Sequence, residues 1–599
     1  MAKSIIRARI AVKNRFFIKI SFQKNQAFGK IFACFHIFSA KVRYYSQRRT
    51  SVKIVLVALN SSYTHTNLAV RIFADILSKK HEVVISETTV NDRGGVLSLC
   101  EKLYEQKADM YAFSVYIWNR EMQLCAASTM KKLLPQSIIV AGGPELSFCD
   151  DAFLAQNPYI DFLIKGEGEA AIVDIADGKY KSPCVVDGGI FDGFSASAEP
   201  CFCAQNAIGC PDGRLFYYES SRGCPFGCSY CLSSVKRAGE KVRAKDVQTV
   251  KKELSVILLH NVKTIKFVDR TFNFDKGRAK EIFSYIIDLA KSAKTKFPTC
   301  HFEICASLLD DETIEILSQA PQGLFRFEIG VQTANSATLC EIGRRDDTQK
   351  ILENVKKLRE KTAVILHLDL IAGLPHDSYE GIAAAFDMIY PFAHHLQLGI
   401  LKLLPGTKMR RKAADYGMKY LDTPPYTIIE SRDFSFADLR KLSSIADTVD
   451  DFCDSEAFSG SIELLAALFS SPFALFEGLY EYFSCRAQLS HREKYAAILD
   501  FAKTTHTVDA DGLFALSEKL RYDFLVSNQG RAPHGIERIY TDSERDELEL
   551  LRKGFVRKMR DEGKDIFVPA LESHFFAFDS QKVYFIDRKN RRVFTQKRG

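Results

Sequence analysis

Apolar residues between positions 52 and 165 form short continuous runs that alternate with stretches at helical spacing. Residues 52–59 (VKIVLVAL) are typical of a buried strand, and residues 68–77 have the spacing of an amphipathic helix. Strand and helix alternating at this pitch predict a parallel sheet covered by helices on both faces. We therefore expect an α/β domain over 52–187. Its further strands are expected at 82–86, 110–115, 137–141 and 162–165.

The same cycle starts again at residue 215 and continues to about residue 425. Six strand–helix units predict a partial barrel of the TIM type, with its active site at the carboxyl ends of the strands. The strands of this core, over 216–425, are expected near 215–218, 264–268, 300–305, 324–330, 364–371 and 397–403.

Three segments fall outside these two domains. Residues 188–215 are rich in Gly, Ser and Ala and are typical of a linker. Residues 426–599 form a C-terminal extension that is mostly helical. Its tail has apolar runs at 574–578, 583–586 and 593–595, separated by turn residues, and predicts a small β-meander.

The charge distribution changes the picture of residues 1–50. The 599-residue chain has a net charge of +8, but residues 1–50 contain 12 Lys and Arg and no Asp or Glu, so the remainder sums to 8 − 12 = −4. A mildly acidic body gives no electrostatic case for binding nucleic acid. We interpret 1–50 as a basic extension outside the fold. A start codon placed too early is favoured over a transit peptide, because Ser is sparse.

Composition limits the class of protein further. The chain is 46% hydrophobic and 26% charged, and no apolar run reaches the ~18 residues of a membrane span. We therefore expect no membrane association. The 16 cysteines lack the spacings of a secreted scaffold and are interpreted as reduced thiols of a cytoplasmic protein.

Three of these cysteines, Cys224, Cys228 and Cys231, are spaced C-x3-C-x2-C directly after the run 215–218. Clustered thiolates are soft ligands suited to zinc or to an iron–sulfur cluster. A structural zinc site would need a fourth Cys or His nearby, and no second C-x2-C pair follows. The alternative to an iron–sulfur cluster is a zinc knuckle or three free thiols. The more scattered Cys201, Cys203 and Cys210 are interpreted as incidental.

This motif, with Tyr230 directly before its third cysteine, resembles the radical S-adenosylmethionine (SAM) superfamily. The resemblance implies that the three cysteines hold a [4Fe-4S] cluster whose remaining iron binds SAM. It also implies that Gln332 and Asp369 bond the SAM ribose. Glu328 and Arg344, with Arg345 as the fallback, would lie near the methionine end, and the Tyr230 backbone would meet the adenine. The segment 373–377 reads GLPHD where the family often has GLPGE.

Strand-end motifs of the first domain, GGPE at 142–145 and KGEGE at 165–169, together with the cysteines resemble cobalamin-binding radical SAM enzymes that carry a C-terminal extension. In that group a flavodoxin-like, Rossmann-type domain holds cobalamin (vitamin B12). The alternative is a degenerate fold that binds nothing. The first loop lacks a D-x-H-x-x-G motif, so we expect cobalamin without its base coordinated and without His65 as a cobalt ligand. The candidate cobalamin-binding residues are Asn60, Ser61, Trp118, Gly142, Gly143, Glu145, Gly166 and Glu167.

The resemblance implies an enzyme that cleaves SAM to a 5′-deoxyadenosyl radical, with cobalamin as second cofactor. The expected reaction is methylation or rearrangement of an unactivated carbon. A flavodoxin- or ferredoxin-type protein would donate the electron, and the substrate would be a small molecule or a peptide. No catalytic side chain can be named. Two alternatives stay open: a tRNA methylthiotransferase-like enzyme, and a non-catalytic cobalamin- or redox-responsive binding protein.

Overall fold

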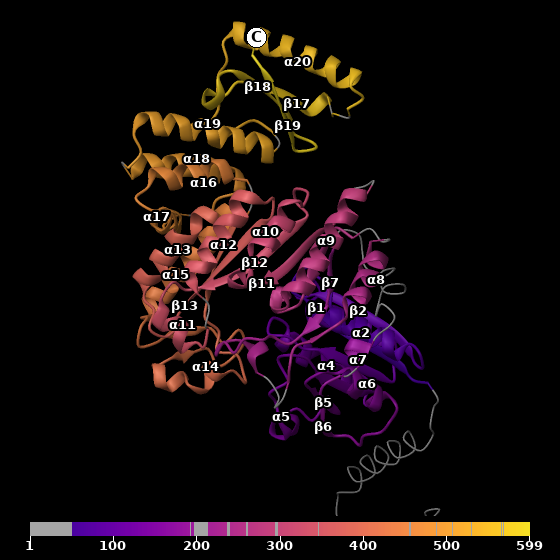
Figure 1. Cartoon of the computed structure of the whole chain (residues 1–599). Coiled ribbons are helices and arrows are strands. Elements are labelled where there is room, and N and C mark those ends of the chain that lie inside the picture. Colours follow the sequence, from indigo (N-terminus) through magenta and orange to yellow (C-terminus); the bar gives the residue numbers. More distant parts are fainter. Residues whose placement is uncertain are drawn as a thin grey trace, which may run out of the picture.

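The structure is a computed structural model. It describes residues 51–599 except for 192, 197–213, 236–239, 259–261, 294–296, 345–346, 455–456, 487, 506, 529, 565, 567 and 599. The chain runs from an N-terminal sheet at the lower right of Figure 1, through a central half-barrel, to a helical extension and a small C-terminal unit at the top. The basic segment 1–50 and the cysteines Cys201, Cys203 and Cys210 lie outside the described residues.

The N-terminal sheet has six parallel strands in the order β2-β1-β3-β4-β5-β6. Its first five strands follow the flavodoxin-like order, so the predicted fold is confirmed. The sixth strand was not predicted from the sequence, because only Val186 of its four residues is buried. The strands are β1 (Lys53–Asn60), β2 (Glu82–Thr89), β3 (Met110–Ser114), β4 (Ile138–Gly142), β5 (Phe162–Lys165) and β6 (Cys184–Asp187).

Helices cover both faces of this sheet, as the continuous apolar strands require. In β1, Val55, Val57 and Leu59 belong to one hydrophobic core, and the alternate residues belong to the core on the opposite face. The helices are α2 (Leu68–Leu77), α3 (Gly95–Glu105), α4 (Arg120–Leu133), α5 (Asp151–Gln156) and α6 (Glu169–Ala176).

The central sheet has six parallel strands in the order β14-β13-β12-β11-β10-β7, with β7 and β14 as open edges. The predicted partial barrel is confirmed. Its strands are β7 (Leu215–Tyr218), β10 (Thr264–Phe267), β11 (Thr299–Ile304), β12 (Phe325–Gln332), β13 (Ile365–Ala372) and β14 (His395–Ile400). Its helices are α8 (Val247–Ile257), α9 (Lys276–Ser292), α10 (Asp311–Ser318), α11 (Ser336–Glu341), α12 (Thr348–Lys361) and α13 (Tyr379–Ile389).

Alternation along these strands divides apolar from polar side chains. In β12, Phe325 and Phe327 pack against Phe283 of the outer helix α9. Arg326 and Glu328 alternate with them and are half-buried. The concave face of the half-barrel is therefore lined by polar side chains, which is where a polar cofactor or substrate can bind.

The C-terminal extension contains α15 (Phe436–Val449), α16 (Ser459–Leu468), α17 (Pro472–Ser484), α18 (His491–Thr504), α19 (Ala510–Ser527) and α20 (Asp542–Asp561). It ends in the antiparallel strands β17 (Leu571–His574), β18 (Lys582–Asp587) and β19 (Arg592–Lys597). The β-meander is confirmed, but its first strand precedes the run expected at 574–578. Ala577 N donates to Glu518 Oε2 at 2.9 Å, and the ring of Phe576 packs against Tyr522. These residues of the run 574–578 therefore pack against α19 and do not form the expected strand.

The remaining short elements are α7 (Gly193–Ala196), α14 (Lys408–Arg411), β8 (Ser221–Arg222) paired with β9 (Arg243–Ala244), and β15 (Lys419–Tyr420) paired with β16 (Ile428–Glu430). Within the described ranges, no single helix is both long and apolar enough to cross a membrane. The pair α16 and α17, bent by 111°, meets the criterion of length and composition only when both helices are taken together.

Candidate functional site

The cysteine loop, residues 223–231, begins after β8 and is held at several points. Ser229 N donates to Ile342 O at 2.8 Å, and Met409 N donates to Ser229 O at 2.8 Å. Ser234 Oγ donates to the carbonyl oxygens of Cys228 and Cys231 at 2.6 and 2.7 Å. These bonds fix the backbone of the loop before any metal binds.

The thiols of the loop differ in burial. Cys228 is buried, and burial raises the pKa of its thiol while the Arg344 charge opposes that shift. Cys224 Sγ lies 3.5 Å from Thr271 Oγ1. Cys224, Cys228 and Cys231 are all free thiols, so each can become a thiolate ligand.

The spacing of the thiols can be compared with what a metal needs. In the part of the chain that the structure describes, no three His, Cys, Asp or Glu side chains lie close enough to hold one metal ion. A [4Fe-4S] cluster does not require that convergence, because each cysteine binds a different iron atom. The loop is therefore compatible with a cluster, and the three cysteines stay its predicted ligands.

Asp269, at the end of β10, anchors the segment just before the loop. Its fully buried carboxylate accepts hydrogen bonds from Ser220 N at 3.0 Å and from the hydroxyls of Ser220 and Ser221 at 2.6 and 2.5 Å. Burial raises its pKa, and these bonds oppose the shift. The sequence prediction gave Asp269 no role. The available signal was a carboxylate that directly follows the expected strand 264–268.

Two predicted SAM-binding residues carry buried polar atoms without a partner in the described residues, namely Gln332 Oε1 and Asp369 Oδ1. Burial, with the charges of Glu328 and Glu303, raises the pKa of Asp369 to about 8. Buried polar atoms are normally hydrogen-bonded, so this pair offers unused acceptors to a ligand. The predicted ribose contacts fit this observation and stay a prediction.

A β-bulge in β12 sets the backbone conformation at Gln332. The register of β12 against β13 shifts between Gly330 and Gln332, and Gln332 has a left-handed φ of 74°. Arg344 lies beside this bulge: its Nη2 donates to Gly330 O at 2.6 Å and its Nη1 lies 3.5 Å from Tyr230 OH. Arg344 thus links the strand to the cysteine loop. The fallback Arg345 lies outside the described residues.

Glu328 is already paired inside the half-barrel. Its Oε2 lies 3.1 Å from both Lys266 Nζ and His301 Nε2. Burial disfavours the carboxylate, but these two partners outweigh burial and lower its pKa to about 2. If Glu328 lies near the methionine end of SAM, as predicted, the ligand would have to share Lys266 and His301 with its carboxylate.

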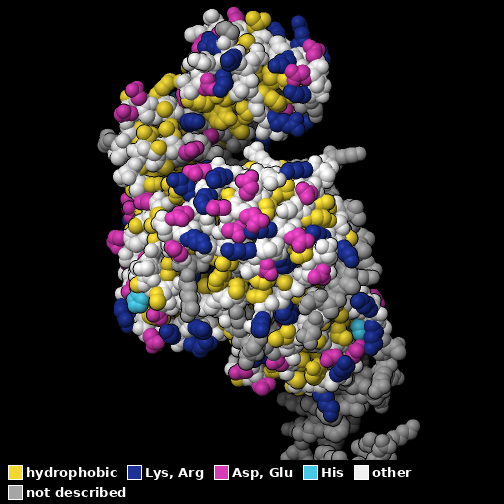
Figure 2. All heavy atoms as spheres, viewed as in Figure 1, with side chains coloured by type: hydrophobic (Ala, Val, Ile, Leu, Met, Phe, Trp, Pro, Cys, Tyr) yellow, Lys and Arg dark blue, Asp and Glu magenta, His cyan; other side chains and the backbone are white. Residues whose placement is uncertain are grey.

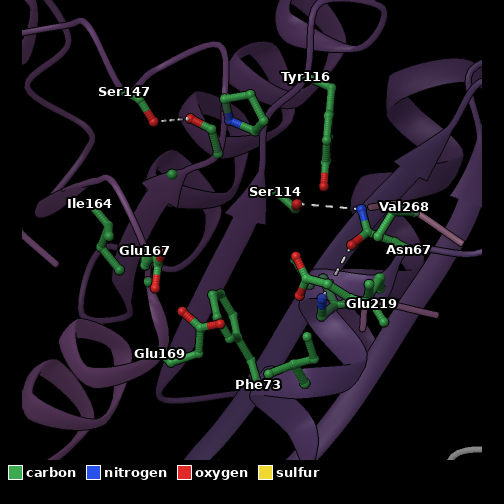
Figure 3. A pocket seen from close by; sticks show the side chains of 18 of the residues that line it. Asn67, Phe73, Ser114, Tyr116, Ser147, Ile164, Glu167, Glu169, Glu219 and Val268 are labelled. Atoms are coloured by element: carbon green, nitrogen blue, oxygen red, sulfur yellow. Dashed lines mark hydrogen bonds between the residues drawn. The ribbon is translucent and has the colours of Figure 1, made fainter. Parts of the chain in front are cut away.

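A cavity of about 740 Å³ lies between the carboxyl ends of the N-terminal strands and the two ends of the cysteine loop, at Gly223 and at Leu232 and Ser233. Figure 3 shows Glu167 and Glu169 on one wall, with Glu219 and Val268 on the opposite wall. The rings of Tyr116 and Trp118 stack at 4.5 Å on its rim. Flat rings, hydroxyls and amides together suit a large macrocycle that carries amide side chains.

Seven of the eight predicted cobalamin-binding residues line this cavity: Asn60, Ser61, Trp118, Gly142, Gly143, Gly166 and Glu167. The eighth, Glu145, is not among the lining residues, and its assignment stays a prediction. Its buried carboxylate pairs with Arg120 Nη1 at 2.8 Å and accepts a hydrogen bond from the Tyr426 hydroxyl. Glu145 thus joins the first domain to the start of the extension.

Two of the lining residues also support the fold of the first domain. Asn60 Nδ2 donates to His65 O at 2.8 Å and to Glu87 Oε1 at 3.0 Å. Gly143 has a φ of +118°, and a Cβ there would lie 2.4 Å from Val115 O. The backbone next to β3 therefore requires glycine at position 143, whether or not a ligand binds there.

His65 also lines the cavity, but its Nδ1 lies 2.5 Å from Tyr217 OH. Burial, then the charge of Lys266, lowers the pKa of this imidazole. The ring joins the two domains where Leu215 N donates to Thr64 O at 2.7 Å. This contact is consistent with the expectation that His65 does not bind cobalt.

Three family models match consecutive parts of the chain. The B12 binding domain matches residues 54–176, and the radical SAM superfamily matches residues 218–389. Fold and matches together define a radical SAM superfamily protein with an N-terminal cobalamin-binding domain. Within this class the chain also matches "Protein of unknown function (DUF4080)" over residues 414–561. The predicted cofactors, a [4Fe-4S] cluster, SAM and cobalamin, are those of these two domain families.

Relatives with assigned activities share about half of the chain. It is 24% identical over 357 residues to the 2-(S-pantetheinyl)-carbapenam-3-carboxylate methyltransferase of Streptantibioticus cattleyicolor, covering 52% of this chain and 50% of that protein. It is 22% identical over 372 residues to the cobalamin-dependent radical SAM methyltransferase TokK of Streptomyces tokunonensis, again covering 52% and 50%. The chain thus spans about half the length of these curated relatives.

Among solved structures, the chain resembles the cobalamin-dependent S-adenosylmethionine radical enzyme OxsB with aqua-cobalamin and S-adenosylmethionine bound. The TM-score is 0.51 at 14% sequence identity, covering 80% of this chain and 77% of that chain. At this identity the likeness concerns the fold alone.

Proposed function

We propose that the protein is a cobalamin-dependent radical SAM enzyme that transfers a methyl group to an unactivated carbon. The single observation that carries this proposal is the cavity bounded by the N-terminal strand ends and by residues at both ends of the cysteine loop. One cavity between the two cofactor-binding domains would let the reactive atoms of the two bound cofactors meet. The methyltransferase names of the relatives support the same reaction. Rearrangement of the carbon skeleton is the other reaction of this class.

When bound, the cluster and SAM supply a 5′-deoxyadenosyl radical, cobalamin supplies the methyl group, and the protein supplies position and water exclusion. Cys224, Cys228 and Cys231 would hold the cluster as thiolates. Arg344 lies beside the bulge of β12 and Tyr230 of the cysteine loop, where it would pair with the SAM carboxylate. Gln332 and Asp369 would accept hydrogen bonds from the ribose through their unpartnered oxygens.

The alternative of a tRNA methylthiotransferase requires a second set of three cysteines in the N-terminal domain. Cys100 is buried in α3, Cys125 is exposed on α4, and Cys149 follows β4. These three cysteines thus lie on three separate segments, and not on one short loop as Cys224, Cys228 and Cys231 do. A methylthiotransferase is therefore disfavoured.

The substrate is proposed as a small molecule or a peptide. The electron donor is proposed as a flavodoxin- or ferredoxin-type protein, and the compartment as the cytoplasm, where cysteines stay reduced. A non-catalytic cobalamin-responsive protein would share the fold but would not cleave SAM.

The test is reconstitution with iron, sulfide, SAM and hydroxocobalamin, followed by reduction and mass spectrometry. We expect 5′-deoxyadenosine together with bound cobalamin. A cluster-loaded, cobalamin-loaded protein that forms no 5′-deoxyadenosine would contradict the enzyme and support the binding protein. S-adenosylhomocysteine formation with labelled SAM would separate methyl transfer from rearrangement.

A further inference from the structure

A basic surface lies directly against the cysteine loop. We define the α14 surface as Lys408, Arg410, Arg411 and Lys412. Three of these side chains are exposed, and that of Arg410 is half-buried. Figure 2 shows Lys and Arg side chains gathered at the lower left of the molecule, where Figure 1 places α14.

The α14 surface and the loop are joined through the backbone. Met409, in the middle of α14, is 1% exposed, and its N donates to Ser229 O within the loop. The tip of the loop reaches solvent at Pro225 and Gly227, although Cys228 behind it is buried. The exposed tip is therefore the place where a cluster held by this loop comes nearest to the surface, and α14 borders it.

The charge of this surface is opposite in sign to the net charge of residues 51–599. Residues 408–412 contain four basic residues and no acidic one, whereas residues 51–599 sum to 8 − 12 = −4. Lys412 pairs with Glu341 at 3.2 Å. Within the described residues, no ion pair neutralises Lys408 or Arg411, whose Nη1 donates to the carbonyl of Gly406 at 2.7 Å. The excess positive charge is therefore available to a partner.

Arg410 has a different role from its neighbours. Its Nη1 donates to Leu403 O at 2.9 Å, and its guanidinium lies over the rings of Tyr420 and Tyr426 at 5.1 and 4.8 Å. It holds α14 on the barrel. The exposed charges that a partner would meet, and that have no acidic partner in the described residues, are those of Lys408 and Arg411.

We propose that the α14 surface is the docking site of a small acidic electron-transfer protein. The proposal rests on the proposed function, because it assigns the route by which the cluster is reduced. One electron leaves the carrier, which is oxidised by one unit, and enters the cluster, which passes from the 2+ to the 1+ state. No bond is made or broken in this step. Opposite charges steer such transient encounters and raise the association rate most strongly at low salt.

The experiment compares two double charge reversals. Lys408→Glu with Arg411→Glu changes the α14 surface. Lys553→Glu with Lys558→Glu makes the same change of charge on exposed positions of α20, at the other end of the molecule (Figure 1). Oxidised flavodoxin is the probe, and its dissociation constant is measured by calorimetry at low and high salt. This readout needs neither a loaded cluster nor turnover.

We expect the wild type and the α20 variant to bind flavodoxin equally, with affinity that falls as salt rises. The α14 variant should bind about tenfold more weakly at low salt and show little salt dependence. Equal affinity of the α14 variant and the wild type would overturn the proposal, as would a wild type that does not bind. Heparin binding that competes with flavodoxin and matches it in strength would assign the surface to polyanions in general and would also overturn it.

A second readout uses the loaded protein. The rate of cluster bleaching by reduced flavodoxin should fall in the α14 variant by the same factor, whereas the rate with the methyl viologen radical cation should not fall. A loss of both rates would mean that the reversal damages the loop itself, which contradicts a docking role. If no preparation takes up a cluster or cleaves SAM, the proposed function fails; equal flavodoxin affinities contradict the docking site alone.

Discussion

Arg222 Nη2 lies 2.5 Å from Glu169 Oε1, and this ion pair ties the residue two positions before Cys224 to the first turn of α6 in the cobalamin-binding domain. The same guanidinium lies 3.0 Å from carboxylate oxygens of Glu167 and Glu219. Burial disfavours its charge, but the three carboxylates outweigh burial and raise its pKa. Arg243, opposite Arg222 in the β8–β9 pair, also binds Glu167. The loop and the cobalamin domain are therefore fixed relative to each other.

Breaking this pair should destabilise the protein strongly. Arg222→Gln is expected to lower the free energy of unfolding by about 3 kcal/mol, because it leaves buried carboxylates without their cation. Glu169→Gln should cost a similar amount, and the double variant less than the sum. Urea unfolding of the four proteins measures the coupling. Lys419→Gln, which breaks the exposed pair with Glu430, is the control and should cost less than about 1 kcal/mol. Additive single and double losses would contradict a direct interaction.

The proposed cluster ligands make a second prediction. Cys228→Ala should abolish the absorbance of the [4Fe-4S] cluster and reduce SAM cleavage to background, because the loop offers no other thiol to that iron. Cys224→Ala and Cys231→Ala should behave alike. Iron content and visible absorbance are the measurements. Cys340→Ala, an exposed thiol outside the loop, should retain both, as should replacement of Cys201, Cys203 or Cys210. Unchanged iron in Cys228→Ala would refute the ligand assignment.

SAM binding should depend on pH through Asp369. Its carboxyl group, with a pKa of about 8 in the ligand-free protein, is protonated at pH 7. If the ribose hydroxyls donate to the ionised form, SAM binding must release a proton. Affinity should then rise with pH up to about 8, by at most about tenfold per unit, and level off above it. Calorimetry in buffers of different ionisation enthalpy measures the released proton. Asp369→Asn should remove this pH dependence, and a retained dependence would assign it to another group.

The same group affects folding stability with a definite sign. The pKa of Asp369 is raised in the folded state from 3.8 to about 8, so the folded protein binds the proton more tightly than the unfolded chain. Its contribution is neutral below pH 4 and grows less favourable as pH rises to 8. Asp369→Asn should therefore flatten the fall in melting temperature over that window.

Cobalamin coordination can be tested at His65. Because His65 Nδ1 is bonded to Tyr217 OH, we expect Co(II) cobalamin in the wild type to show no nitrogen splitting in electron paramagnetic resonance. His65→Ala should keep that spectrum. Tyr217→Phe removes the same hydrogen bond but keeps the imidazole, and it controls for loss of the domain contact. Nitrogen splitting that disappears in His65→Ala alone would show that His65 binds cobalt. Gly143→Leu is unsuitable as a test of cobalamin binding, because a side chain there meets Val115 O.

Deletion of residues 1–50 makes a further prediction about the fold. The segment has no packing pattern in sequence, so the protein from residue 51 onward should keep its melting temperature and its cofactor content. Thermal unfolding and iron and cobalamin assays compare the two lengths. Loss of folding on deletion would place the segment in the core.

Much of the architecture was predictable because its signals are local. The run of β1 and the spacing of α2 identify these elements without knowledge of their partners, and repetition of the cycle gives two parallel sheets. The cysteine motif needs only eight residues, so its chemistry can be recognised before folding is considered. By contrast, β6 has one buried residue and leaves no local pattern.

The partners of charged side chains were decided only by the tertiary structure. Arg222, Glu167 and Glu169 come from two domains, and no spacing in sequence relates them. Glu145 was named as a candidate cobalamin-binding residue because it ends the motif GGPE, whereas its carboxylate pairs with Arg120 and accepts a hydrogen bond from the Tyr426 hydroxyl. The sequence by itself determined most strands and helices of the two parallel sheets and the position of the cysteine motif, since these depend on neighbours within a few residues. Which carboxylates face a cofactor and which hold domains together depends on burial and on charges brought close by folding, and these exist only in three dimensions.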